Sequence, residues 1–342
     1  MKGIVLALLL LMFWGKELLA QTAFYQGKSI RLIAGTSAGG AQDLWARFLA
    51  LHFGKHIPGN PDIVVQNMPG AGSMIAANHI YNVAKPDGLT LGMFNPSLYI
   101  EQLTGQKEVQ YDWLKFTWIG SPEPINQVLF VRADTPYKTL EDIRKATEPP
   151  RCAATGRGTA GHFYPKLIEE ALGTKFNMVV GYGGGGDMDM AIEKGEIHCR
   201  AGTTSAFVVR EPTRTWYKNG FVRPLVQSGL TREAKLPEVP TIYELMEAQK
   251  TPEAFRRVAK VMLASGDLGR PVAGGPGLPA ERIKILRDAF NKMVGDTEFL
   301  ADAKKRGLEV IPLRGEELER IGKELLVQPP DVIERVKKVL AQ

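Results

Sequence analysis

Strand-forming runs alternate with helix-forming stretches along almost the whole chain, and this order restricts the fold more than any other feature of the sequence. A first series of strand-like runs occupies residues 30–35, 63–67, 89–94, 117–120 and 127–134. A second series occupies residues 151–156, 177–182, 197–202 and 222–229, with helical patterns at 160–172, 184–194 and 204–218. Repeated strand–helix–strand order predicts parallel sheets with helices on their faces. With 342 residues, the chain has the length expected of two such α/β domains.

Local signals indicate where helices begin and where the chain changes direction. Thr139 and Asp142 have the spacing of a capping box, so a helix should begin after Thr139. The segment 235–245 carries two prolines and interrupts the strand–helix rhythm, and we interpret it as a return crossing between the domains. Beyond Pro279, apolar residues recur at helical spacing, which predicts a helical C-terminus.

The first twenty residues have the layout of a secretory signal peptide. Lys2 precedes an apolar run from Ile4 to Trp14, and small residues follow near Ala20. This run is too short to cross roughly 30 Å of hydrocarbon as a helix. A buried N-terminal helix is the alternative. We predict a signal peptide of residues 1–20, cleavage near Ala20 and a periplasmic protein, and no cysteine lies near that point to carry a lipid anchor.

The charge balance is mildly basic, with a formal net charge of +6. Loss of residues 1–20 removes Lys2, Lys16 and Glu17, which leaves +5. Basic residues are mixed with acidic ones along the chain rather than gathered in blocks, so we expect no nucleic-acid partner. A general preference for anionic small molecules is consistent with this balance.

Cys152 and Cys199 are the only cysteines of the chain. Neither belongs to a C-x-x-C or Cys/His pattern, so the sequence does not support a structural zinc site. Both lie in predicted strands of the second domain. In an oxidising compartment they form either a disulfide or two buried thiols, and the sequence does not decide between these two states.

Three glycine-rich turns follow predicted strands, at residues 35–47, 66–78 and 154–167. Small residues let a ligand approach the backbone, and the helix after such a turn presents free N–H groups and the positive end of its dipole, where anions bind. In the third turn Thr159 is placed to cap the helix, Arg157 to supply a positive charge, and His162 lies one turn into the helix. The alternative for each loop is an ordinary tight turn.

Asp187 and Asp189 follow a run of four glycines at a predicted helix start. The helix dipole alone favours acidic residues at such a position. The functional interpretation is that Asp187 points into a ligand site, where its carboxylate binds an amino or hydroxyl group or fixes a water molecule.

Motifs of catalysis are largely missing. Two stretches, 156–161 and 181–186, match the G-x-G-x-x-G pattern of dinucleotide-binding turns, but neither has the acidic residue expected on a following strand. The sequence contains no P-loop and no H-E-x-x-H. We therefore expect neither an enzyme nor a cofactor, with a nucleotide-dependent enzyme as the weaker alternative. His52 and His56 have the i,i+4 spacing of metal ligands, but we expect them to face solvent and predict no metal site.

Six segments carry a family resemblance in their order and spacing. They are IRLIAGTSAGGAQDLWAR, VVQNMPGAGSMIAANHI, PDGLTLGMFNPSL, GRGTAGHF, VVGYGGGGDMDMAIEKGEIH and LPEVPTIYEL. Together they resemble the substrate-binding receptors of tripartite tricarboxylate transporters, also called Bug receptors. The resemblance implies a periplasmic-binding-protein type II fold, with two α/β lobes and a ligand cleft between them. It also implies an extracytoplasmic solute-binding protein that captures a small carboxylate and delivers it to the membrane subunits of such a transporter. A carboxylate sensor for a signalling system is the alternative.

The resemblance places ligand contacts on both lobes. Carried over by position, the predicted contacts are Ser37, Ala38, Gly39, Gly40, Gln42, Asn67, Gly70, Asn95, Ser97, Arg157, Gly158, Thr159, His162, Asp187, Thr203 and Thr204. Two positions depart from the family pattern: this chain has Met68 where members often have Arg, and Arg157 where they often have Ser or Gly. Moving positive charge between the lobes would alter which carboxylate fits.

We predict that lobe I combines residues 24–124 with 238–342 and that lobe II comprises residues 125–237. The protein is expected to act as a monomer. Its carboxylate ligand should bind where backbone N–H groups at helix starts of the two lobes converge, and closure of the lobes should bury it.

Overall fold

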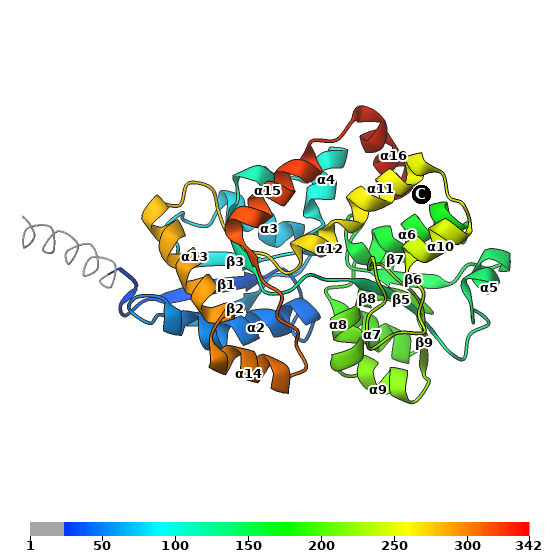
Figure 1. Ribbon diagram of the computed structural model, residues 1–342, viewed down its shortest axis with the longest axis horizontal. Helices are drawn as coiled ribbons and strands as arrows, with labels where there is room; N and C mark the ends of the chain where they lie inside the picture. Colours follow the sequence, from blue (N-terminus) through cyan, green and yellow to red (C-terminus); the bar gives the residue numbers. More distant parts are fainter. Residues whose placement is uncertain (1–23, 342) are drawn as a thin grey trace, which may run out of the picture.

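Two β-sheets, each covered by helices, lie side by side in the computed structural model, which describes residues 24–341 (Figure 1). The early strands of the first sheet are drawn in blue and cyan, and the strands of the second sheet are mostly green. This arrangement confirms the prediction of a mixed α/β protein with two sheets. The predicted signal peptide, residues 1–20, lies outside the described residues.

The first sheet has six strands; its central strands are buried on both faces, whereas the edge strand at residues 62–67 is partly exposed. In spatial order the strands are β11 (Leu313–Arg314), β4 (Thr117–Ser121), β10 (Val272–Gly274), β3 (Thr90–Met93), β1 (Ser29–Ala34) and β2 (Asp62–Asn67). β1 is parallel to β2 and β3, whereas β10 is antiparallel to β3 and β4. Along β1, Leu32 and Ala34 join one apolar cluster and Ile33 joins the cluster on the opposite face. Strands that are buried on both faces need continuous apolar runs of this kind, and such runs made these strands predictable from the sequence.

The second sheet has five strands. In spatial order they are β7 (Asn177–Val180), β6 (Arg151–Ala154), β8 (Cys199–Thr203), β5 (Gln127–Arg132) and β9 (Val222–Gln227). β6 is parallel to β7 and β8, and β5 is antiparallel to β8 and β9. Cys152 and Cys199 face each other in the register of β6 and β8 and form a disulfide, which decides between the two alternatives left by the sequence.

Helices cover both faces of each sheet. Those around the first sheet are α2 (Ala41–Phe53), α3 (Met74–Asn82), α4 (Leu98–Thr104), α13 (Ala280–Val294), α14 (Thr297–Lys305) and α15 (Gly315–Leu326), with short 3₁₀ turns at Gly54–His56, Ala71–Ser73 and Trp113–Lys115. Those around the second are α5 (Leu140–Lys145), α6 (Ala160–Leu172), α7 (Gly185–Glu193), α8 (Thr204–Val209), α9 (Thr213–Lys218), α10 (Ile242–Ala248), α11 (Glu253–Leu263) and α16 (Pro330–Ala341). One apolar cluster runs continuously from α3 and α15 to α6 and α11 and so joins the two halves.

Two predicted helices show what local signals decide. The helix expected after Thr139 is α5, and both hydrogen bonds of its capping box are present, from the Asp142 amide to Thr139 Oγ1 at 3.1 Å and from the Thr139 amide to Asp142 Oδ2 at 2.9 Å. The single helix predicted at 204–218 is wrong. The chain forms α8 and α9 instead, because Pro212 lacks the amide hydrogen that a continuing helix needs.

The chain first passes between the sheets at residues 122–126 and returns at residues 264–271, through α12 (Ser265–Leu268). These two crossings lie side by side. The Ile125 amide donates a hydrogen bond to the Gly266 carbonyl at 2.9 Å, and the Arg270 amide donates to Ser121 Oγ at 2.8 Å. Together they form the connection about which the halves of the molecule are joined.

The segment 235–245 does not make the return crossing that its prolines suggested. Thr241 pairs with Gln227 at the end of β9, and the helix α10 that follows packs against α6. Helix α11 also packs against α6, so the chain stays beside the second sheet until about residue 263. The lobe boundaries predicted from the sequence stay a prediction, and these contacts favour a second boundary nearer residue 264.

Candidate functional site

A cavity of about 150 Å³ lies between the two sheets. Gly35 and Thr155 line it directly after the carboxyl ends of β1 and β6, and Gly183 lines it three residues after the end of β7. Ligands of open α/β sheets bind outside the carboxyl ends of the strands, so the cavity occupies the expected place. A cavity of this order accommodates a molecule about the size of benzene.

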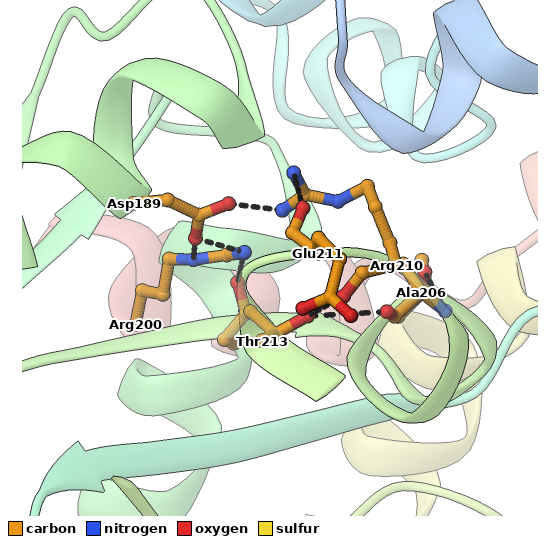
Figure 2. Close-up of polar contacts among 8 residues, drawn as sticks. Asp189, Arg200, Ala206, Arg210, Glu211 and Thr213 are labelled. Carbon is orange, nitrogen blue, oxygen red and sulfur yellow. Dashed lines mark hydrogen bonds and ion pairs between the residues drawn. The ribbon is translucent and has the colours of Figure 1, made fainter. Parts of the chain in front are cut away.

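Three charged residues form a cluster on the side of the second sheet (Figure 2): Arg200 and Arg210 line the cavity, and Asp189 pairs with both. Arg200 donates to Asp189 Oδ1 from Nε at 2.9 Å and from Nη2 at 2.7 Å, and Arg210 Nη2 donates to the other carboxylate oxygen. Burial lowers the pKa of Arg200, and the charge of Asp189 opposes this effect. Because two guanidinium groups share one carboxylate, the cluster keeps one formal positive charge next to the cavity.

The start of helix α7 faces the same two guanidinium groups. A methyl group added at Gly185 would lie 3.6 Å from Arg210 Nη2 and 3.9 Å from Arg200 Nη2. The free N–H groups and the positive dipole end of α7 therefore add to the positive potential of the arginines. A charged group of opposite sign is the favoured occupant of this end of the cavity.

A second buried ion pair lies where the two crossings meet, and its arginine, Arg270, lines the cavity. Arg270 Nε lies 2.6 Å from Glu123 Oε1, and Arg270 Nη2 donates to Thr203 Oγ1 at 3.2 Å. Burial raises the pKa of Glu123, and the Arg270 guanidinium opposes this shift. Since Glu123 lies on the outgoing crossing and Arg270 on the returning one, the pair connects the cavity to the joint between the halves of the molecule.

Loops of the two sheets touch at the mouth of the cavity. The Ser37 amide donates to the Gly183 carbonyl at 3.1 Å, and Ser37 Oγ donates to Asp187 Oδ2 at 3.2 Å. On the other side Gly72 lies against Thr159: a methyl group added at Gly72 would come within 2.2 Å of Thr159 Cγ2. These contacts show that the halves are closed around the cavity.

The sequence profile of the family described as "Tripartite tricarboxylate transporter family receptor" matches residues 46–335. The chain belongs to this receptor family. A protein of Cupriavidus necator, "UPF0065 protein in gbd 5'region", is 26% identical over 328 residues, which are 94% of this chain and 92% of the relative.

Solved structures agree with this assignment. The periplasmic binding protein BugD is similar with a TM-score of 0.73 at 20% identity, over 92% of this chain and 98% of that one. MatC from Rhodopseudomonas palustris, solved with bound malate, is similar with a TM-score of 0.70 at 18% identity, over 92% of this chain and 99% of that one. The likeness confirms the predicted periplasmic-binding-protein type II fold.

Members of the family are periplasmic binding proteins that act as receptors rather than enzymes, as the sequence predicted for this chain. Within residues 24–341, no helix has the length and apolarity required to span a bilayer.

The structure brings only part of the predicted contact set to the cavity of the receptor. Five of these residues line it: Gln42, Gly70, Asn95, Thr159 and Thr203. Eleven do not: Ser37, Ala38, Gly39, Gly40, Asn67, Ser97, Arg157, Gly158, His162, Asp187 and Thr204. Ligand contact by all sixteen residues stays a prediction, and the position of the first five supports it for them.

Several residues outside the cavity support the loops that surround it. Asn67 Nδ2 donates to Asp43 Oδ1 at 2.8 Å and to the Thr36 carbonyl at 3.0 Å, which holds the first glycine turn. Ser97 Oγ donates to Asn95 Oδ1 at 2.8 Å and so orients a side chain that does line the cavity. Asp187 accepts a hydrogen bond from Ser37 at the mouth, and its predicted contact with a ligand stays a prediction.

Arg157 and His162 are displaced from the cavity for different reasons. Arg157 is exposed and borders a separate surface hollow between α4 and α16. His162 is buried in α6, and burial lowers its pKa to about 4. Its Nδ1 atom has no hydrogen-bond partner among the described residues.

Three arginines that line the cavity, Arg200, Arg210 and Arg270, are absent from the contacts predicted from sequence motifs. Arg200 interrupts a mostly apolar predicted strand, and a buried arginine in such a place needs a carboxylate partner. That signal was available in the sequence. Arg210 and Arg270 come just after the short helices α8 and α12, and nothing in their local sequence indicates that the fold brings them together.

The two histidines with metal-ligand spacing each lie close to a carboxylate. His52 Nε2 lies 3.2 Å from Asp302 Oδ2, and His56 Nε2 lies 3.7 Å from Asp296 Oδ2. His52 is buried against α14, so the expectation that it faces solvent is wrong. Among residues 24–341 no group of three or more His, Cys, Asp or Glu side chains is arranged to hold a metal ion.

Proposed function

We propose that this receptor captures a small organic carboxylate in the cavity between its two sheets and delivers it to the membrane subunits of a tripartite tricarboxylate transporter. One observation carries the proposal: Arg200, Arg210 and Arg270 line one closed cavity together with glycine turns from both sheets. Asp189 and Glu123 balance two of these three charges, so an anion completes the neutralisation.

Closure supports capture rather than catalysis. The contacts from Ser37 to Gly183 and from Gly72 to Thr159 form only when the halves approach each other. A ligand that bridges the halves stabilises this state, because the closed state gains contacts to the ligand that an open state lacks. The bound malate of the MatC structure is consistent with a carboxylate as the guest here.

Calorimetric titration of the exported protein with succinate, malate, adipate and citrate tests capture. We expect at least one acid to bind, and Arg210→Gln to weaken its binding by at least about tenfold through loss of a charge-assisted hydrogen bond. Arg157→Gln is the matched control, since Arg157 is exposed and lies outside the cavity. Equal affinities of the two variants would contradict the assignment of the site.

An uptake assay separates delivery from sensing. Cells without this gene should lose uptake of the acid identified by titration, and the wild-type gene but not the Arg210→Gln variant should restore it. Unchanged uptake in the deletion strain would favour the signalling alternative. N-terminal sequencing of the periplasmic protein should give a start near Gln21, and a retained Met1 would refute the predicted signal cleavage.

A further inference from the structure

A second hollow adjoins the cavity between α2 and α8, and we call it the side pocket. Its volume is about 290 Å³. Its lining residues are Ala41, Leu44, Trp45, Phe48, Ser205, Ala206, Val209, Arg210, Glu211, Arg270, Arg306 and Leu308. Aliphatic and aromatic side chains from both halves of the molecule thus make up most of its wall.

The side pocket and the cavity share part of their lining. Ala41, Ala206, Arg210 and Arg270 border both spaces. The two arginines carry the positive charge to which an anionic ligand would bind. A carboxylate bound to these arginines would lie beside the small side chains of Ala41 and Ala206, at the border of the side pocket. The rest of such a ligand could therefore extend into the side pocket.

The apolar wall is incompletely covered in the structure. Leu44 in the side pocket is 43% exposed, while Trp45 and Phe48 behind it are buried. An apolar group placed in the side pocket would remove part of the Leu44 side chain from water, which is favourable in proportion to the area buried. Glu211 and Arg306 also line the side pocket. A wholly polar ligand would contact such side chains but would gain no contribution from burial of apolar area.

We propose that the ligand of this receptor is an amphipathic organic acid, with a carboxylate at Arg210 and Arg270 and an aliphatic or aromatic arm in the side pocket. This inference rests on the proposed capture of a carboxylate and specifies which carboxylates are preferred. A short dicarboxylate uses only the arginine end of the site, whereas an acid with an arm uses both spaces.

Succinate and 2-benzylsuccinate test the inference, because they share two carboxylates and differ by one aromatic arm. We expect 2-benzylsuccinate to bind the wild-type protein at least about tenfold more tightly, since burial of several apolar carbons contributes this much or more. Leu44→Trp should fill the side pocket and abolish the difference while changing succinate affinity less than twofold. Leu51→Trp is the matched control, on the same helix and 57% exposed but outside the side pocket.

The outcomes are distinguishable. Succinate binding without an advantage for 2-benzylsuccinate would overturn the inference and leave carboxylate capture standing. An advantage that persists in Leu44→Trp would also overturn it, because the arm would then lie elsewhere. Absence of binding by both acids and by the other carboxylates titrated would overturn the proposed function, and this inference with it.

Discussion

Replacing Asp189 with asparagine should destabilise the receptor while increasing the stabilisation that an anionic ligand provides. The side chain of Asp189 is only 3% exposed and accepts hydrogen bonds from both Arg200 and Arg210. In Asp189→Asn, the amide nitrogen is a donor and meets guanidinium donors, and no negative charge remains between the two arginines. Removing one partner of a buried ion pair costs about 3–5 kcal/mol, because the other partner stays charged in a medium of low polarity.

The effect on binding has the opposite sign. The cluster of Arg200, Arg210 and residue 189 changes from one formal positive charge to two, and both guanidinium groups gain free hydrogen-bonding capacity beside the cavity. A carboxylate ligand takes over the role of the lost side chain. Ligand-induced stabilisation should therefore be larger in Asp189→Asn than in the wild-type protein.

Thermal unfolding with and without the bound acid measures both effects. We expect the unfolding midpoint of the free protein to fall by roughly 5–10 °C and the ligand to restore a large part of this loss. Asp187→Asn is the matched control on the same helix, since Asp187 is only partly buried and makes a single 3.2 Å hydrogen bond with Ser37. Equal midpoints for the two variants, or a smaller ligand effect in Asp189→Asn, would refute the reasoning.

Three further predictions follow from other contacts. Gly72→Ala places a methyl group within 2.2 Å of Thr159 Cγ2 and should hold the two halves of the molecule apart. The affinity for the bound acid should then fall at least about tenfold, and X-ray scattering of the liganded protein should show a larger radius of gyration than for the wild type. An unchanged radius of gyration would contradict this prediction. Burial raises the pKa of the Glu101 carboxyl above 4.5, so the folded state binds this proton more tightly than the unfolded state does. The stability of the protein should therefore fall as pH rises from 4.5 through the raised pKa. In Glu101→Gln this pH dependence of the unfolding midpoint should flatten, and an unaltered profile would count against the prediction. Burial lowers the pKa of His162 to about 4, so this side chain contributes stability that is present above pH 6.5 and is lost as pH falls toward 4. His162→Gln should therefore show a smaller fall of the unfolding midpoint on acidification than the wild-type protein. An equally steep fall would assign the loss of stability to other groups.

The fold was predictable where one local pattern decided the structure. Helix α6 has the predicted bounds, and every strand predicted from an apolar run appears with ends shifted by a few residues. Prediction failed where two signals competed. The helical periodicity of residues 204–218 continues across Pro212, and the prolines of 235–245 mark a loop at the edge of the second sheet rather than a change of lobe.

The site was less predictable than the fold because it depends on contacts between distant residues. Glycine turns after strands could be located from sequence, and residues such as Gln42 and Thr159 do line the cavity. Arg270 reaches the same space from a crossing nearly seventy residues beyond Thr203, and only the tertiary structure places their side chains 3.2 Å apart. Conversely, Arg157 follows a predicted strand beside the cavity, yet its side chain turns to the surface near α16.

The last helix restricts how far the receptor can open. Helix α16 packs against α4 beside the first sheet and against α6 and α11 beside the second, away from the crossings at residues 122–126 and 264–271. The two halves are thus tied at two separate places, so a wide swing about the crossings would have to detach this helix from one side. Entry of a ligand therefore requires either a small rotation of the two halves that preserves the α16 contacts or a transient release of the C-terminal helix. A fusion partner attached to the C-terminus would then change the rate at which the ligand enters and leaves.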